Sequence, residues 1–261
     1  SMALSDNVTE DALLGGQITL RQHAAGYRVA IDPVLLAASV PADESDTVLD
    51  VGTGVGAAML CLAKRVAGAK ITGVEVQRDL VHLAVENIAE NGLTERIEAM
   101  VGDLQRPPPR LVPRSFDHVM ANPPYFEAGR VRPSGKDEKA TANIEGAGGL
   151  GAWVDYCLSM VRPGGTISMI HRTDRLAELL GLLGDKAGDV MIFPLWPRNP
   201  FDLEGDGEDL APVAAKRVIV QALAGSKGPL RMAAGLVLHK DNGDNTPAAD
   251  AILRHGSALI L

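Results

Sequence analysis

Between residues 47 and 121 the chain alternates short runs of β-branched residues with longer helical patterns. Strands are expected at residues 47–51, 70–75, 97–101 and 116–121, with helices at 57–66 and 79–91 between them. Strands that alternate with helices form βαβ units, because a parallel neighbour is reached only through a long crossover. The segment therefore predicts a mostly parallel sheet covered by helices on both faces.

The rest of the chain continues this pattern. We expect helices at residues 151–161 and 174–183, strands at 166–171 and 190–195, and a final strand pair at 217–223 and 236–239. A turn region at 225–228 joins the final pair, which predicts an antiparallel edge. The expected fold class is α/β: a Rossmann-like, doubly wound, mostly parallel seven-stranded sheet with an antiparallel edge strand.

The first 40 residues predict a small N-terminal cap ahead of this sheet. A hairpin-like segment is expected to end in a helix at 33–40, with Asp32 as its N-cap and Pro33 as its first residue. Asp79 is expected to cap the helix at 79–91 in the same way. We divide the chain into a cap segment, residues 1–40, packed on a core domain, residues 41–261.

Composition and charge exclude several classes of protein. The chain is 46% hydrophobic and 22% charged, and no apolar stretch approaches the roughly 18 residues of a membrane-spanning helix. Cys61 and Cys157 lie far apart and are expected to be small buried side chains, so neither a disulfide nor a metal site is predicted. With no targeting signal at the N-terminus, we expect a cytoplasmic protein that needs no membrane and no metal.

The net charge of −8 gives the chain no bulk attraction for nucleic acid. A polynucleotide substrate would therefore need a local basic patch. Basic residues flank the strand at 116–121, at Arg106, Arg110, Arg114, Arg130, Arg132, Lys136 and Lys139. Because acidic residues lie among them, a solvated loop explains this group as well as a phosphate-binding one does.

A glycine-rich turn follows the first strand, in the segment Asp50-Val51-Gly52-Thr53-Gly54-Val55-Gly56. Glycines at a strand-to-helix turn let a ligand lie against the backbone, and the start of the helix offers unpaired N–H groups. The spacing also satisfies the dinucleotide pattern G-x-G-x-x-G/A, and a tight structural turn would use the same residues. The turn alone is therefore weak evidence for a cofactor site.

Two further acidic residues strengthen this interpretation. Glu75 ends the strand at 70–75, where it could accept both ribose hydroxyls of an adenosine, and Asp103 follows the strand at 97–101, where it could accept an adenine amino group. The carboxyl ends of parallel strands meet at one edge of a sheet. Asp50, Glu75 and Asp103 together therefore predict a nucleoside site there.

The segment Asn122-Pro123-Pro124-Tyr125 directly follows the strand at 116–121. It resembles the (Asp/Asn)-Pro-Pro-(Tyr/Phe) signature of class I S-adenosylmethionine-dependent methyltransferases that methylate a planar nitrogen. Two acceptors, the Asn122 side-chain oxygen and the Pro123 carbonyl, could hold both N–H groups of such an amine and orient its lone pair. Neither proline donates a competing N–H group, and Tyr125 could stack on the target base.

Two more segments, Gly26–Ala38 and Ala215–Val218, resemble the bacterial tRNA1(Val) adenine N6-methyltransferase family. The resemblance implies S-adenosylmethionine as cofactor and an adenine N6 in tRNA as target. It places the cofactor at Asp50, Gly52, Gly54, Gly56, Glu75 and Asp103, and the amine at Asn122, Pro123, Pro124 and Tyr125. Asp32 could also help to cover the cofactor. An acidic insertion at 202–209 and an extension after Gly225 depart from the family pattern and leave the RNA substrate open.

Other functions remain open from the sequence. Glutamine N5 methylation of a protein uses the same four-residue signature, and guanine N2 methylation of ribosomal RNA is also possible. An NAD-binding oxidoreductase would use the glycine–acid arrangement without the signature. A non-catalytic RNA-binding module is disfavoured, because binding alone has no need of a motif that orients an amine.

Overall fold

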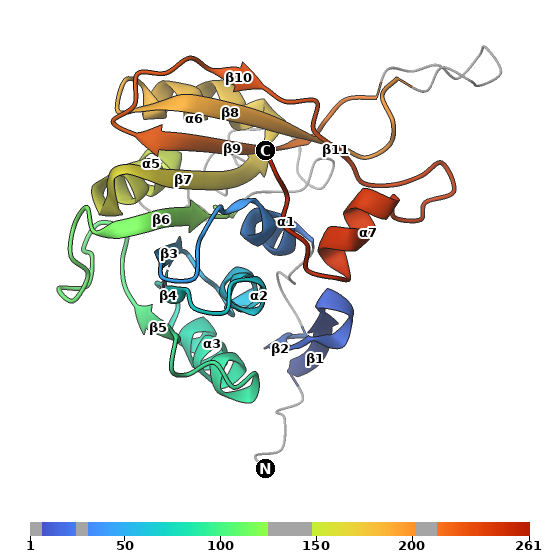
Figure 1. Cartoon of the computed structure of the whole chain (residues 1–261). Helices are drawn as coiled ribbons and strands as arrows, with labels where there is room; N and C mark the ends of the chain where they lie inside the picture. Colours follow the sequence, from blue (N-terminus) through green and yellow to red (C-terminus); the bar gives the residue numbers. More distant parts are fainter. Residues whose placement is uncertain (1–6, 25–30, 125–147, 202–212) are drawn as a thin grey trace, which may run out of the picture.

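The computed structural model describes residues 7–24, 31–124, 148–201 and 213–261, and its centre is one large sheet with helices on both faces (Figure 1). The strands of this sheet are β3 (Thr47–Val51), β4 (Lys70–Glu75), β5 (Ile97–Val101), β6 (Phe116–Ala121), β7 (Val161–Arg172), β8 (Ala187–Trp196), β9 (Arg217–Ala224), β10 (Arg231–Met232) and β11 (Leu236–Val237). The helices are α1 (Asp32–Ser39), α2 (Ala57–Arg65), α3 (Arg78–Glu90), α5 (Gly149–Met160), α6 (Leu176–Leu183) and α7 (Pro247–Leu253). The predicted doubly wound α/β class is confirmed, but the sheet has nine strands among the described residues rather than seven, because the short strands β10 and β11 add to β8.

The strand order places the expected ligand edge at the middle of the sheet. The order is β10-β8-β9-β7-β6-β3-β4-β5, with β11 also paired to β8. From β3 the chain first winds outward to β5, and it then returns to the other side of β3 as β6 and β7. The winding direction therefore reverses between β3 and β6, and open parallel sheets bind ligands at such a reversal.

The prediction of an antiparallel edge strand was wrong. β9 lies between β7 and β8 and is antiparallel to both, whereas β11 pairs with β8 in parallel. The physical reason lies in burial: Val218, Ile219 and Val220 are buried on both faces of β9, as an interior strand requires. The expected pairing joined the strands at 217–223 and 236–239 because they are neighbours in sequence, whereas each of them pairs with β8.

Two clusters of buried side chains cover opposite faces of the sheet. One face packs against α1, α2, α3 and α7, and the other packs against α5 and α6. Neighbouring residues of one strand alternate between them, as Val48 and Leu49 of β3 do. Cys61 and Cys157 are free and buried, as expected. No helix within the described ranges is both long and apolar enough to span a bilayer.

Neither predicted aspartate N-cap is present. α1 begins at Asp32 itself, and α3 begins at Arg78, and neither helix has a side-chain cap. The Asp32 side chain is buried, 3% exposed, and forms an ion pair with Arg217 of β9. A helix cap contributes typically about 1 kcal/mol. Leaving a buried carboxylate without a cation costs more than this, so Asp32 pairs with Arg217 instead.

The N-terminal hairpin is present and is held to the core by side-chain amides. β1 (Val8–Leu13) and β2 (Ile18–His23) form a separate antiparallel pair. Asn87 of α3 accepts the Arg21 amide N–H at 2.8 Å, and its own amide donates to the carbonyls of Arg21 and Val55, each at 2.9 Å. Asn91, one turn later, makes the same pair of bonds with the Thr19 backbone. The two amides thus satisfy the free edge of β2 in the manner of a neighbouring strand. The division at residue 40 stays a prediction.

Replacing Asn87 with Ala is expected to lower the free energy of unfolding by about 2–4 kcal/mol. The side chain is fully buried, and its loss leaves three backbone groups without partners, each a cost of about 1–3 kcal/mol before relaxation. Urea unfolding measures the change. Val85→Ala, at an exposed position of the same helix, is the control and should shift stability by less than about 0.5 kcal/mol. Equal urea midpoints for the two variants would contradict this role of Asn87.

Candidate functional site

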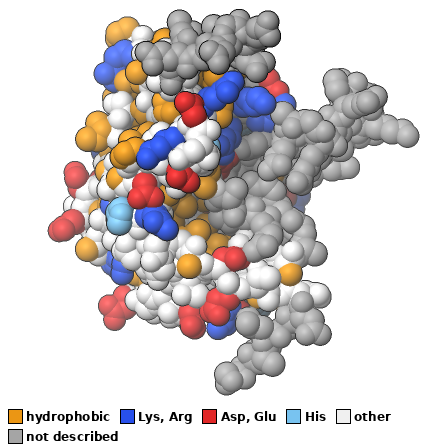
Figure 2. Space-filling view, turned by 90° about the vertical axis from the view of Figure 1, so that its right-hand side faces the viewer, with side chains coloured by type: hydrophobic (Ala, Val, Ile, Leu, Met, Phe, Trp, Pro, Cys, Tyr) orange, Lys and Arg blue, Asp and Glu red, His pale blue; other side chains and the backbone are white. Residues whose placement is uncertain are grey.

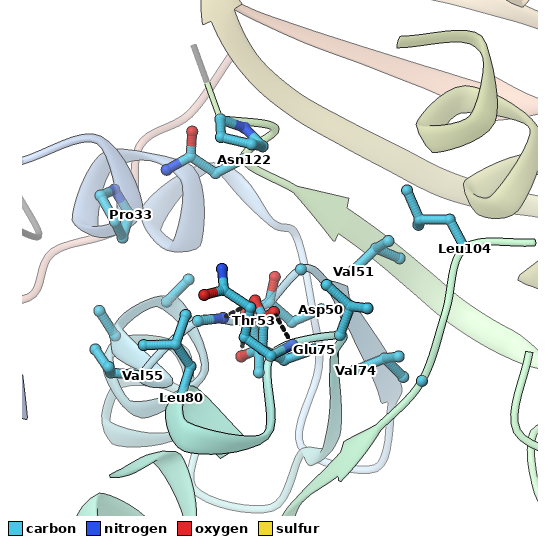
Figure 3. A pocket seen from close by; sticks show the side chains of 18 of the residues that line it. Pro33, Asp50, Val51, Thr53, Val55, Val74, Glu75, Leu80, Leu104 and Asn122 are labelled. Carbon is cyan, nitrogen blue, oxygen red and sulfur yellow. Dashed lines mark hydrogen bonds between the residues drawn. The ribbon is translucent and has the colours of Figure 1, made fainter. Parts of the chain in front are cut away.

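A cavity of about 700 Å³ opens where the winding of the sheet reverses (Figure 3). This volume lies within the range of small-molecule sites, about 300–1,000 Å³. Its walls come from the carboxyl ends of β3, β4 and β6, from the loop after β5, and from α5, β2 and α1. The structure therefore brings the glycine turn, the acidic residues and the start of the Asn-Pro-Pro segment to one cavity.

The glycine turn is fixed to β4 by two backbone hydrogen bonds. The N–H groups of Gly52 and Thr53 both donate to the Val74 carbonyl, at 2.8 and 2.9 Å. Gly52 and Gly54 have φ angles of +72° and +56°, a conformation that glycine adopts without strain. A Cβ at Gly52 would lie 2.2 Å from the Trp153 ring, whereas a Cβ at Gly54 would meet nothing within 4 Å. The absence of a side chain at Gly52 therefore serves packing, and its absence at Gly54 leaves space for a ligand beside the backbone.

Asp50 is a buried carboxyl at the cavity wall. It is 2% exposed, and the Thr53 hydroxyl donates to it at 2.7 Å. Burial raises the pKa of Asp50 from 3.8 to about 7; the Thr53 bond opposes this shift, and the nearby charge of Glu75 adds to it. A cation in the cavity would stabilise the charged form of Asp50, because the described lining holds two further carboxylates, Glu75 and Asp103, and no Lys or Arg.

Glu75 links the glycine turn to the start of α3. Its carboxylate accepts the Gly54 amide N–H at 3.1 Å and the Gln77 amide N–H at 2.8 Å. Burial raises the pKa of Glu75, although the backbone hydrogen bonds from Gln77, Gly54 and Val76 act in the opposite direction. A carboxylate has about four acceptor positions, so Glu75 retains acceptor capacity beyond its backbone bonds. The side chain can therefore hold the turn and accept from a ligand at the same time.

The remaining predicted residues are placed as follows. Asp103 lines the cavity, and its carboxylate accepts the Gln105 amide N–H at 3.0 Å. Asn122 and Pro124 line it as well, whereas Gly56 and Pro123 are not among the lining residues. Figure 3 shows Asn122 and Pro33 on one side of the cavity and Asp50, Thr53 and Glu75 across from them. Tyr125, the basic residues at 130–139 and the acidic insertion at 202–209 lie outside the described residues.

Several wall residues could not have been found from local pattern. Gln22 and His23 reach the cavity from β2, and Trp153 reaches it from α5. Pro33 was identified only as the first residue of a helix, and it lines the cavity beside Asn122. Each depends on packing between elements far apart in sequence. Of the flanking arginines, Arg110 pairs with Glu98 at 2.5 Å. Across the described ranges, no group of three or more His, Cys, Asp or Glu side chains could hold a metal ion.

Comparison with known proteins supports the resemblance. Residues 27–138 match the family model described as methyltransferase small domain. A tRNA1(Val) (adenine(37)-N6)-methyltransferase from Shewanella halifaxensis is 34% identical over 60% of this chain and 63% of its own. A release factor glutamine methyltransferase from Chlorobaculum tepidum is 28% identical over 60% of this chain and 56% of its own. The chain therefore spans less than two thirds of the length of either relative.

A solved structure agrees over a longer range. The crystal structure of a predicted O-methyltransferase from Agrobacterium tumefaciens superposes with a TM-score of 0.69 and 25% identity, over 88% of this chain and 99% of that one. Together these matches confirm the predicted resemblance to S-adenosylmethionine-dependent methyltransferases and their Rossmann-like fold.

The buried Asp50 carboxyl predicts how the stability of the protein without ligand changes with pH. Its pKa in the folded protein, about 7, exceeds the ordinary value of 3.8. The folded state therefore binds more protons than the unfolded state between these values, and stability falls as pH rises through that window. From pH 4.5 to pH 8, the free energy of unfolding measured with urea should fall by roughly 2–4 kcal/mol more in wild type than in Asp50→Asn.

Asp43→Asn removes an exposed carboxyl outside the cavity and is the control. Its stability relative to wild type should change by less than about 0.5 kcal/mol over the same interval. A difference between wild type and Asp50→Asn that is equally large at both pH values would contradict the assignment of a raised pKa to Asp50.

Proposed function

We propose that this chain transfers a methyl group from S-adenosylmethionine to an exocyclic amine, with adenine N6 in tRNA as the substrate. The observation that carries the proposal is the single cavity with Asp50 and Glu75 at one side and Asn122 at the other. Glycine turns and acids after parallel strands also occur in dinucleotide enzymes. The Asn-Pro-Pro segment at the same cavity favours amine methylation instead.

S-adenosylmethionine is the cofactor indicated by the family match and the structural similarity. The residues present fit it, because an open backbone at Gly54 adjoins two buried carboxylates that a positively charged ligand would stabilise. We assign Asp50, Gly52 and Gly54 to its methionine end, Glu75 to its ribose and Asp103 to its adenine. Gly56 acts less directly in this assignment, since it sets the start of α2 behind the turn.

The substrate side of the proposed site is built on the end of β6. Asn122 is half-buried at the cavity wall, and its side-chain amide has no hydrogen-bond partner among the described residues. In the proposed mechanism its oxygen accepts one N–H of the target amine, and the Pro123 carbonyl accepts the other. Pro124 brings no N–H that could compete for these acceptors, and Tyr125 stacks on the target base.

The chemistry needs positioning more than a strong base. When bound, the cofactor supplies an electrophilic methyl group on a sulfonium. The lone pair of an adenine amine is delocalised into the ring, so the amine must be held with its lone pair toward the methyl. Two acceptors on the N–H groups do this, and their hydrogen bonds strengthen as positive charge develops on the nitrogen.

Glutamine N5 methylation is the second candidate. The observation that favours it is similarity to the release factor glutamine methyltransferase of Chlorobaculum tepidum, and a planar amide nitrogen needs the same two acceptors. The tRNA adenine relative is more similar, at 34% against 28% identity. We therefore place tRNA first.

Asn122→Ala is expected to lower kcat for methylation of a tRNA transcript by about 10²–10³, the scale for one pre-organised polar group. The hydrogen bond acts mainly in the transition state, so affinity for S-adenosylhomocysteine should stay within about threefold of wild type. Steady-state kinetics and calorimetry measure the two effects. A wild-type rate in Asn122→Ala would contradict the proposed role of Asn122 and would mean that the Asn-Pro-Pro segment is only a structural turn.

Glu75→Gln is the matched comparison on the cofactor side. It removes a charge without changing the size of the side chain, and it should weaken S-adenosylhomocysteine binding by roughly 1–3 kcal/mol through lost charge-assisted hydrogen bonds. If Asn122→Ala lowers the rate without lowering cofactor affinity, and Glu75→Gln lowers the affinity, the amine and the cofactor lie at opposite sides of the cavity. Unchanged affinity in Glu75→Gln would remove the ribose assignment.

A further inference from the structure

The carboxyl edge of the sheet carries opposite charge in its two halves. The cofactor half, at the carboxyl ends of β3, β4 and β5, holds four carboxylates, Asp50, Glu75, Asp79 and Asp103, against two arginines, Arg78 and Arg106. The other half, at β7, β8 and β9, presents five cations, which we call the basic surface: Arg172, Arg175, Arg198, Lys216 and Arg217. In Figure 2, which faces this edge, several blue side chains lie in the upper half, the half that holds β7–β9, with red side chains among them. The cations are therefore concentrated on the substrate side.

Strand pairing fixes part of this surface. Arg172 at the end of β7 and Arg217 at the start of β9 are direct partners in the antiparallel ladder, and the Thr173 amide donates to the Lys216 carbonyl at 2.9 Å. Direct partners lie on the same face, and like charges in that relation are destabilising. The fold offsets this by pairing Arg172 with Asp174 and Arg217 with the buried Asp32.

Two cations of the surface are more accessible to a ligand. Lys216 and Arg198 are exposed, at the start of β9 and just after the end of β8. Arg175 and Arg172 have side chains 23% and 26% exposed, and each pairs with an exposed carboxylate that a stronger anion could replace. The surface can therefore offer both point charges and planar guanidinium groups to phosphates.

The surface is also close to the proposed target site. β7 lies between β6 and β9, and neighbouring strands are about 4.8 Å apart. Lys216, which directly precedes β9, therefore lies two strand spacings to the side of Asn122 and three residues further along the strand direction, roughly 14 Å away in all. A nucleotide with its base at Asn122 would have flanking phosphates within reach of these long side chains.

We propose that the basic surface holds the sugar–phosphate backbone of the polynucleotide whose base enters the cavity. This inference rests on the proposed function and names the part of the molecule that recognises its substrate. A chain with a net charge of −8 needs such a local patch to hold a polyanion. The described part of the chain thus supplies one from strands β7, β8 and β9, independently of the basic residues at 130–139.

The test is the double variant Arg198→Gln with Lys216→Gln, measured for binding to a tRNA transcript over a range of KCl concentrations. Each lost phosphate contact should reduce the slope of log affinity against log salt by about 0.7–0.9. We expect affinity at low salt to fall by about tenfold and the slope to decrease by between one and two. S-adenosylhomocysteine affinity should not change, because neither residue lines the cavity.

The matched control is Lys70→Gln with Arg231→Gln, which removes one lysine and one arginine that are exposed away from the carboxyl edge. It should leave the salt slope at its wild-type value. Equal slopes for all three proteins would overturn the basic surface, as would an equal loss in the control. Methylation kinetics distinguish the two proposals. If the Arg198–Lys216 variant methylates RNA with a wild-type KM, the basic surface is overturned and the proposed methyl transfer is not affected.

Failure of the proposed function has a different signature. If wild type methylates a glutamine-containing peptide but no tRNA, and also does not bind the transcript, both the tRNA assignment and the basic surface are overturned. If it binds the transcript with the expected dependence on Arg198 and Lys216 but does not methylate it, the surface stands and the adenine assignment fails.

Discussion

The carbonyl of Val74 determines the geometry of the carboxyl edge. By accepting the N–H groups of both Gly52 and Thr53, it holds the glycine turn against the end of β4. Thr53 is thereby placed to donate to Asp50, and Gly54 to donate to Glu75. The turn can follow this path because Gly52 carries no Cβ, which would otherwise collide with Trp153. Two carboxylates and an open backbone therefore face one cavity.

This arrangement keeps two acidic groups in an environment that opposes their charge. Burial raises the pKa of both Asp50 and Glu75, and the charge of Glu75 contributes to the shift at Asp50. A cationic ligand would relieve that unfavourable interaction, so affinity for such a ligand and instability without it have the same origin. The division of charge along the sheet edge extends this logic, since in our proposal the carboxylates face the cofactor and the cations face the substrate.

The sequence was sufficient for the parts of the molecule that depend on local pattern. β-Branched runs, glycine spacing and an acid after each strand predicted β3 to β6 and brought Asp50, Glu75, Asp103 and Asn122 to one edge. It was insufficient where the outcome depends on competition between distant elements. The insertion of β9 between β7 and β8, the pairing of Asp32 with Arg217, and the attachment of β2 to Asn87 all join residues far apart in the chain.

The central claim is that the cavity joins a methyl donor to an exocyclic adenine amine in tRNA. The most direct measurement is mass spectrometry of nucleosides from a tRNA transcript incubated with the protein and S-adenosylmethionine that carries a deuterated methyl group. We expect the label in N6-methyladenosine with wild type, and no label there with Asn122→Ala. Label found at guanine N2 or in protein glutamine, with none in adenosine, would contradict it.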